Sequence, residues 1–112
     1  MVKYRASAMD RTFSALSDPT RRSILSRLKD EPGLSVSELA RPLSLKLPGI
    51  MKHLDVLSTA GLITRTKTGR TVAISLSVEP MQEAMEWLNQ YERFWTASLD
   101  RLVAFVEKDG GE

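Results

Sequence analysis

The sequence predicts a mainly α-helical fold of about five helices with one small β-hairpin. Two observations support this prediction: the helical spacing of Ile50, Leu54 and Leu57, and the alternating β-branched segments that follow shortly after them. Capping residues, prolines and glycines divide the rest of the chain into further helical stretches. A chain of 112 residues, 42% of them hydrophobic, can build one modest core, so we expect residues 1–112 to form a single domain.

The N-terminal part of the chain predicts two helices in succession. Residues 1–7 show no clear period, so we expect a loose N-terminal segment there. From Met9 onward the apolar residues follow a helical spacing, which predicts a first helix. Residues 18–20 (Asp-Pro-Thr) supply an N-cap and a proline at the first helical position. They predict a second helix, which residues 32–33 (Pro-Gly) end.

The following residues predict a helix-turn-helix. Residues 35–38 (Ser-Val-Ser-Glu) have the form of a capping box, so we expect a third helix that runs to about Leu43. The four residues 44–47 have a length that sets two helices at a steep angle. The next helix is expected to begin at Pro48, which has no N–H to leave unpaired, and to end at Gly61, which can turn left-handed. We call this second helix of the pair the reading helix, because that helix enters the major groove in DNA-binding proteins with this motif.

A basic hairpin is predicted directly after the reading helix. Residues 64–68 and 71–75 alternate and are rich in β-branched side chains, and a Thr-Gly dipeptide joins them. Residues 41–70 carry six basic residues and one acidic residue, a local charge of +5 within a chain whose net charge is +2. Residues 79–112 carry eight acidic and three basic residues. This asymmetry predicts that the middle of the chain contacts a polyanion such as double-stranded DNA.

The predicted DNA-contacting residues lie around the start of the reading helix and on the hairpin. Pro48 and Gly49 are slim, so the helix end can approach base edges closely and Lys52 can reach them. His53, the only histidine, either contacts a phosphate or is partly buried and bonded to the backbone. The hairpin cations are expected mainly to contact phosphates. The complete predicted set is Lys46, Pro48, Gly49, Met51, Lys52, His53, Arg65, Lys67 and Arg70.

One long helix, residues 80–108, is predicted at the C-terminal end. Its apolar row is widened by Trp87, Phe94 and Phe105 beyond what one small domain can bury. A second copy of the chain is therefore the expected cover. Trp87 and Trp95 could instead line a ligand pocket between the two subunits, although large aromatic residues on a long helix more often form an interface core.

The residue inventory argues against enzymatic, metal-binding and membrane roles. The chain has no cysteine and one histidine, a poor basis for a metal site, so we expect no metal and no cofactor. No nucleophile accompanied by a base is evident, which argues against an enzyme. No apolar run is long enough to cross a bilayer and none resembles a signal peptide, so we expect a cytoplasmic protein.

Segments along nearly the whole chain resemble the ArsR-type (arsenic-repressor-like) family of winged helix-turn-helix regulators. They include RTFSALSDPTRRSILSRL (11–28), PGIMKHLDVLSTAGLI (48–63) and TGRTVAISL (68–76). The resemblance implies that the hairpin is a wing. It also implies a homodimeric bacterial DNA-binding repressor whose first and last helices form the dimer interface. The residues expected at that interface are Phe13, Met85, Leu88, Tyr91, Trp95, Leu99 and Leu102.

Two departures from the family pattern bear on function. Metal-sensing members place Cys-Val-Cys at the start of the third helix, where this chain has Ser-Val-Ser at residues 35–37, and the last helix has no histidine. The chain therefore resembles a non-metal-sensing subgroup. Members commonly have small hydroxyl residues at the positions of Lys46 and Met51, so the family's base contacts there cannot be transferred unchanged.

Two functional classes remain open at this point. The first is a sequence-specific repressor that binds an inverted-repeat operator as a dimer. The second is a winged-helix protein-interaction module that does not bind DNA. The basic reading helix and the basic hairpin favour the first class, since acidic residues there would favour the second. The operator sequence, the regulated genes and the existence of a small-molecule inducer are not encoded in any recognisable pattern.

Overall fold

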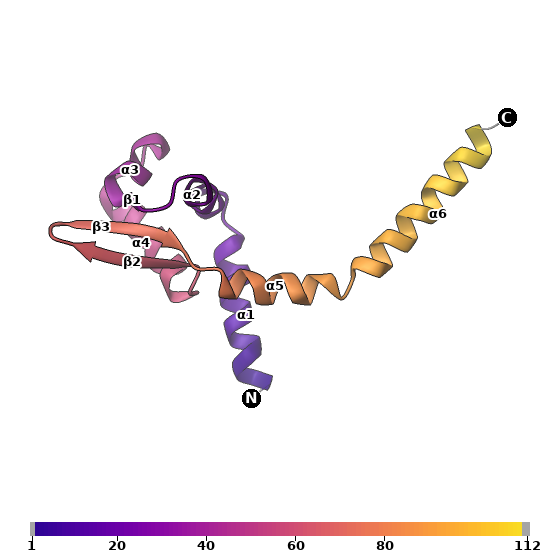
Figure 1. Ribbon diagram of the computed structural model, residues 1–112, viewed down its shortest axis with the longest axis horizontal. Helices are drawn as coiled ribbons and strands as arrows, with labels where there is room; N and C mark the ends of the chain where they lie inside the picture. The colour runs from indigo at the N-terminus through magenta and orange to yellow at the C-terminus, as the bar shows by residue number, and fades with distance from the viewer. Residues whose placement is uncertain (1, 111–112) are drawn as a thin grey trace.

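Six α-helices and a three-stranded sheet make up residues 2–110, the part of the chain that the computed structural model describes (Figure 1). The predicted mainly α-helical fold with a β-hairpin is confirmed. In chain order the elements are α1 (Val2–Leu16), α2 (Pro19–Asp30), β1 (Leu34–Ser35), α3 (Val36–Ala40), a 3-10 turn η1 (Arg41–Leu43), α4 (Leu47–Thr59), β2 (Ile63–Thr68), β3 (Thr71–Leu76), α5 (Glu79–Asn89) and α6 (Glu92–Gly110).

One hydrophobic core lies among α1 to α4 and the sheet. The predicted inner face of the reading helix, which is α4, is confirmed because Ile50, Leu54 and Leu57 are each 0% exposed. Full burial of such a side chain contributes roughly 1.5–3 kcal/mol, so this face anchors α4 firmly. The rest of the buried cluster consists of Ala15, Ile24, Leu25, Leu28, Leu34, Leu39, Leu62, Ile63 and Ile74.

The helix boundaries predicted from capping residues agree with the structure at three places. The Asp18 carboxylate accepts from the backbone N–H of Arg21 at 3.0 Å and so caps α2. Ser35 and Glu38 form the predicted capping box, with reciprocal hydrogen bonds of 3.0 and 3.2 Å. Gly61 adopts a φ of +76° after α4, the left-handed conformation that was predicted.

The sheet is antiparallel with the order β1-β3-β2. Gly69 has a φ of +63° and begins the two-residue turn between the paired Thr68 and Thr71. Because Gly69 is the only turn residue with a positive φ, the turn is of type II′. Strand β1 was not predicted, since two residues are too short to show an alternating pattern.

Two predictions about the N-terminal half were wrong in detail. Helix α1 already begins at Val2, so residues 2–7 are helical and do not form the loose N-terminal segment that was expected. Met1 lies outside the described residues. This stretch has no proline or glycine to interrupt a helix. The third helix ends at Ala40, and the chain continues to Leu43 as a tighter 3-10 turn that has Pro42 as its second residue.

The predicted single C-terminal helix is in fact two helices, α5 and α6, which we call the arm. At the break, the backbone N–H groups of Gln90 and Tyr91 bond three residues back, to the carbonyl oxygens of Trp87 (3.3 Å) and Leu88 (3.0 Å). The arm extends away from the rest of the molecule, which consists of α1 to α4 and the sheet and which we call the body (Figure 1). The Cα radius of gyration is consequently 19.2 Å, whereas a compact chain of this length would have about 13 Å.

Candidate nucleic-acid interface

The turn before α4 leaves the start of the reading helix open to solvent. Ser44 has a φ of +54°, a left-handed conformation that redirects the chain after η1. The carbonyl oxygen of Lys46 then accepts from the N–H groups of Gly49 (3.0 Å) and Ile50 (3.2 Å), which closes the first turn. Helix α4 thus begins at Leu47, one residue before the predicted start.

The first turns of α4 present two cations and a slim apolar surface. Lys46, Pro48 and Lys52 are exposed, and Leu47 is 58% exposed. Gly49 is half-buried, and a Cβ added there would meet only the side chain of Leu45, at 4.0 Å. The N-terminal end of a helix carries a partial positive charge, so this end of α4 suits phosphate groups as well as base edges.

A groove of about 500 Å³ separates the start of α4 from the hairpin. Met51 lies in this groove, half-buried and packed against the core. Met51 also lines a smaller hollow of about 240 Å³, together with Arg65 and Lys67 of the hairpin. Met51 is therefore less free to extend outward than Lys52. The residues that line the groove are Ser35, Val36, Ser37, Leu47, Met51, Arg70, Thr71 and Val72.

The three hairpin cations differ in their partners. Arg65 donates to Asp55 of α4, with 2.8 Å between Nη2 and Oδ1. Lys67 and Arg70 are exposed, and within the described part of the chain neither forms an ion pair. The Arg65–Asp55 pair could not be read from neighbouring residues, because the two are ten positions apart. The strand register gives a partial signal, since Arg65 pairs with the buried Ile74 and so faces α4.

His53 points toward α2 and away from the groove. Its Nδ1 lies 3.3 Å from Nη1 of Arg21 and 4.0 Å from Oδ2 of Asp18, and its side chain is 23% exposed. The ring is partly buried, as one of the two alternatives expected, but its recorded partners are two side chains and not the backbone. The other alternative, contact with a phosphate, stays a prediction.

Sequence reasoning missed the role of two arginines at the start of α2. Arg21 donates to the carbonyl oxygens of Ser14 (3.1 Å) and Ala15 (2.8 Å), and Arg22 donates to that of Leu16 (2.8 Å). The last carbonyl groups of a helix have no partner within the helix, and cations stabilise that end. The signal in the sequence is that α1 has no basic residue in its last turn, whereas α2 begins with two.

Two carboxylates of the helix caps titrate below their ordinary range. The backbone N–H of Arg21, followed by the charge of the same residue, lowers the pKa of Asp18 from 3.8. The backbone N–H and then the hydroxyl of Ser35 lower the pKa of Glu38 from 4.5. Both shifts arise because hydrogen bonds favour the ionised form. These caps are therefore charged at neutral pH.

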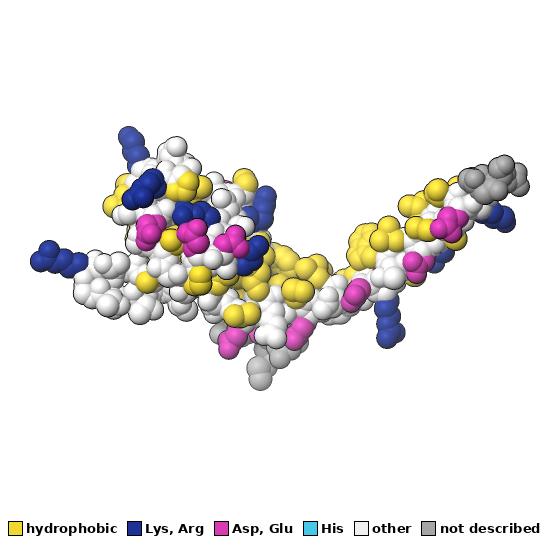
Figure 2. Space-filling model, turned by 45° about the horizontal axis from the view of Figure 1, so that its top comes forward, with side chains coloured by type: hydrophobic (Ala, Val, Ile, Leu, Met, Phe, Trp, Pro, Cys, Tyr) yellow, Lys and Arg dark blue, Asp and Glu magenta, His cyan; other side chains and the backbone are white. Residues whose placement is uncertain are grey.

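The arm exposes a nearly continuous apolar surface. Figure 2 shows yellow apolar side chains along both helices of the arm. Among the residues predicted for the dimer interface, only Phe13 is half-buried, edge-on against Trp87 at 5.9 Å between ring centroids. Trp87 also contacts Tyr91 at 5.2 Å, so it belongs to an aromatic cluster within one chain. The other predicted interface residues, Met85, Leu88, Tyr91, Trp95, Leu99 and Leu102, are 44–61% exposed.

Two further features of the described residues concern other kinds of site. Among the side chains that the structure describes, those of residues 7–108, no three His, Asp or Glu gather closely enough to hold a metal ion. The helices within residues 2–110 are also too short or too polar to cross a bilayer.

Comparisons with known proteins agree with this geometry. A family model described as a helix-turn-helix domain matches residues 16–66. The chain is 35% identical over 112 residues to the HTH-type transcriptional regulator Rv2034 of Mycobacterium tuberculosis, covering 100% of this chain and 99% of that protein. It is 32% identical over 80 residues to the transcriptional repressor SdpR of Bacillus subtilis, covering 71% of this chain and 88% of SdpR.

A solved structure gives the corresponding result for the fold. The crystal structure of the ArsR family transcriptional regulator RHA00566 matches with a TM-score of 0.73 and 37% identity, over 81% of this chain and 93% of that one. The sequence likeness to Rv2034 extends over the whole chain, and therefore over both the helix-turn-helix and the hairpin. The chain belongs to the ArsR-type family of winged helix-turn-helix transcriptional regulators.

Proposed function

We propose that this regulator is a homodimeric repressor that binds an inverted-repeat operator in the cytoplasm, with α4 reading bases and the wing contacting phosphates. The observation that carries the proposal is the groove of about 500 Å³ between the start of α4 and the hairpin, which Arg70 lines. Further exposed cations lie on the same two elements. Lys46 and Lys52 lie on the side of α4, and Lys67 and Arg70 on the side of the hairpin. Family membership supports the DNA-binding class over the interaction module.

The start of α4 is the part suited to direct base readout. Pro48 and Gly49 keep the helix end slim, so its backbone can approach the floor of the major groove. Lys46 and Lys52 are exposed cations that can donate to guanine O6 and N7. Leu47 and Met51 offer apolar contacts of the kind that thymine methyl groups accept. His53 is oriented toward α2, so we assign it no contact with a base.

The wing is suited to affinity more than to sequence discrimination. Lys67 and Arg70 are exposed on flexible stems, which matches contacts to phosphates of the DNA backbone. Arg65 already donates to Asp55, so it gives up an existing partner when it binds a phosphate. We therefore expect Arg70 to contribute more to DNA affinity than Arg65.

Dimerisation through the arm and α1 would place two reading helices on one duplex. The large apolar residues from Met85 to Val106 are 40–64% exposed, a patch of the kind that marks protein–protein contact. A closed dimer has twofold symmetry, so its operator is an inverted repeat. The half-sites are then separated by about one helical turn, roughly 34 Å, or a multiple of it.

Selection of genomic fragments bound by the purified protein, followed by binding measurements across a salt series, tests this proposal. Lys52→Ala should cost about 1–3 kcal/mol on the selected operator and relax its sequence preference. Arg70→Ala should weaken operator and scrambled DNA alike and lower the salt slope by about 1 for each phosphate that is no longer neutralised. Lys108→Ala removes an exposed cation from the arm and serves as the matched control. If the wild type preferred no fragment, the result would favour the alternative function, a winged-helix protein-interaction module that does not bind DNA.

A further inference from the structure

A polar junction built around Arg21 joins α1, α2 and α4. One guanidinium makes three hydrogen bonds: Nε donates to the carbonyl oxygen of Ala15 (2.8 Å), Nη2 to that of Ser14 (3.1 Å), and Nη1 to Nδ1 of His53 (3.3 Å). A guanidinium holds its donors in a rigid planar fork and has no acceptor. The C-terminus of α1 and the middle of the reading helix are therefore tied to the same side chain.

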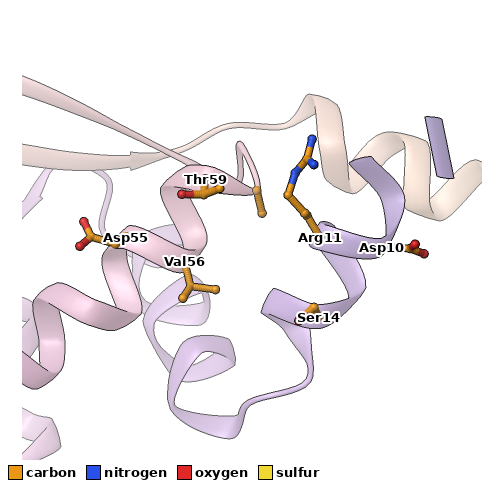
Figure 3. Close-up of a pocket in the computed structure, with 7 residues that line it drawn as sticks. Asp10, Arg11, Ser14, Asp55, Val56 and Thr59 are labelled. Atoms are coloured by element: carbon orange, nitrogen blue, oxygen red, sulfur yellow. The ribbon is translucent and has the colours of Figure 1, made fainter. Parts of the chain in front are cut away.

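A surface hollow between α1 and α4 reaches this junction at Ser14, whose carbonyl oxygen accepts from Arg21. The two helices leave a pocket of about 430 Å³ between them (Figure 3). Val56 of α4 points into this space, whereas the carboxylates of Asp10 and Asp55 point away from it. This hollow opens to solvent, and most of the residues that line it are exposed. The buried face of α4 anchors the helix to the core, and the contact between Arg21 and His53 adds a directional restraint outside that core.

We infer that Arg21 and His53 are positioning residues for DNA reading: Arg21 holds the reading helix in one orientation against the C-terminus of α1 through the ring of His53. The inference rests on the proposed function, in which α4 enters the major groove. His53 directly follows Lys52, which faces the DNA in that proposal. Helix α1 also contacts the arm, through Phe13 and Trp87. The junction thus connects the dimer-forming side of the molecule to the DNA-reading side.

The protonation state of His53 decides whether this connection exists. Arg21 can only donate, so Nδ1 must accept and the neutral ring must carry its hydrogen at Nε2. The charged groups that face the ring are Arg21 and Asp18, while α1 presents carbonyl oxygens to the same guanidinium. On α4 itself the nearest charged residues along the chain are Lys52 and Asp55. A protonated ring cannot accept from Arg21, is repelled by it and is attracted to Asp18, so acid breaks the connection.

Three substitutions distinguish the positioning of α4 by Arg21 and His53 from a general contribution of these residues to the stability of the fold. Arg21→Lys keeps the charge but cannot make the three hydrogen bonds of the fork. Arg22→Lys is the matched control, since Arg22 also caps α1, through Leu16, but does not contact His53. His53→Asn places an amide oxygen near the position of Nδ1 and can accept from Arg21 at every pH. Urea unfolding of each variant checks that it is folded before DNA binding is measured.

The first measurement is the ratio of operator affinity to scrambled-DNA affinity, taken at about pH 8 and again after acidification to about pH 5.5. For the wild type and for Arg22→Lys, this ratio should fall about five- to ten-fold on acidification, the lower range of coupling between two sites. For His53→Asn it should stay high and flat. For Arg21→Lys it should already be low at the alkaline end. A ratio that rises in acid would mean that His53 binds phosphate instead and would overturn the inference.

The second measurement needs no DNA. Because His53 is the only histidine, the ring nitrogen signals in ¹⁵N NMR of the intact protein report on it without overlap. The wild type and Arg22→Lys should show the Nε2–H tautomer, and Arg21→Lys should show a mixture. Identical ring signals in all three proteins would refute the role of Arg21. If the wild type showed the Nε2–H tautomer but preferred no DNA sequence, the proposed function would be wrong. The positioning role, which rests on that function, would then be wrong as well.

Discussion

The body and the arm of this protein bury their apolar residues to opposite extents. Every residue of the buried core cluster lies between Ala15 and Ile74. On the arm, the large apolar residues from Met85 to Val106 are 40–64% exposed, and Ala84 is the one buried apolar residue among those described. Similar hydrophobic content therefore serves two purposes. The body forms a core within one chain, whereas the arm displays a surface that only another molecule can cover.

The largest effect is expected from charges placed on the arm. Changing both Leu88 and Trp95 to Glu should weaken dimerisation by at least two orders of magnitude, because an unpaired charge buried in an interface costs about 3–5 kcal/mol. Unfolding of the body should change little, since both residues are exposed within one chain. Sedimentation velocity over a range of concentrations measures the change.

The matched control for this test adds the same charge one position further along. The control variant carries Asn89→Glu and Thr96→Glu. Asn89 and Thr96 directly follow Leu88 and Trp95 and are also exposed, but they are polar. The control pair should remain dimeric at concentrations where the first pair is monomeric. A wild type that sediments as a monomer at micromolar concentration would remove the basis for the comparison.

The next effect contrasts equal truncations in the two regions. Leu54→Ala in α4 should lower the free energy of unfolding by about 2–5 kcal/mol at every protein concentration, because it leaves a cavity in a filled core. Leu99→Ala in α6 should lower stability only where dimer is present. Urea unfolding at two or more protein concentrations distinguishes the cases. If both variants showed the same concentration-independent decrease in stability, the arm would have its own core within the chain.

A smaller effect is expected in acid, and it should arise in the body. Asp18 and Glu38 have lowered pKa values in the folded protein, so the unfolded chain binds more protons as the pH falls through their ordinary values of 3.8 and 4.5. Their stabilisation is complete above that range and is lost below it. Glu38→Gln keeps an acceptor for the capping box but removes one titration. Urea midpoints from about pH 6 to about pH 3 should therefore fall less steeply for this variant. Equal slopes for both proteins would contradict the assignment.

The last prediction is that metals and chelators have no effect on this protein. Residues 35–37 are Ser-Val-Ser, which offers no thiolate to a metal at the start of α3. Adding a chelator, zinc, cadmium or arsenite should therefore change neither unfolding nor operator affinity. A stoichiometric metal that released the protein from DNA would disprove this expectation for both regions.

Local patterns in the sequence predicted most of the body, although they missed β1 and the start of α1, but they did not predict the break in the arm. The buried face of α4 follows from the spacing of three apolar residues, and the caps at Asp18 and Ser35 follow from side chains that bond within three residues. The break at Gln90 could not be predicted, because the apolar row continues across it and no proline or glycine marks it. The helix there ends through a change in backbone hydrogen bonding that side-chain periodicity does not record.

The candidate site shows the same limit. The cations around α4 and the wing were identifiable, because like charges cluster within thirty residues of chain. The pairings of Arg65 with Asp55 and of Arg21 with His53 were not, since they join residues 10 and 32 positions apart. Such pairs depend on how helices pack against one another. That packing was also what removed His53 from the surface proposed to contact DNA.

The short turn at Gln90 and Tyr91, which we call the pivot, sets the angle between α5 and α6. Helix α6 has 19 residues, and at about 1.5 Å per residue it is roughly 28 Å long. A rotation of about 10° at the pivot moves its far end by about 5 Å, a sizeable part of the roughly 34 Å between successive half-sites on DNA. In a dimer joined through the arm, substitutions at these two residues would change the distance between the reading helices without altering either one. Operator spacing and base preference can then evolve independently in one chain.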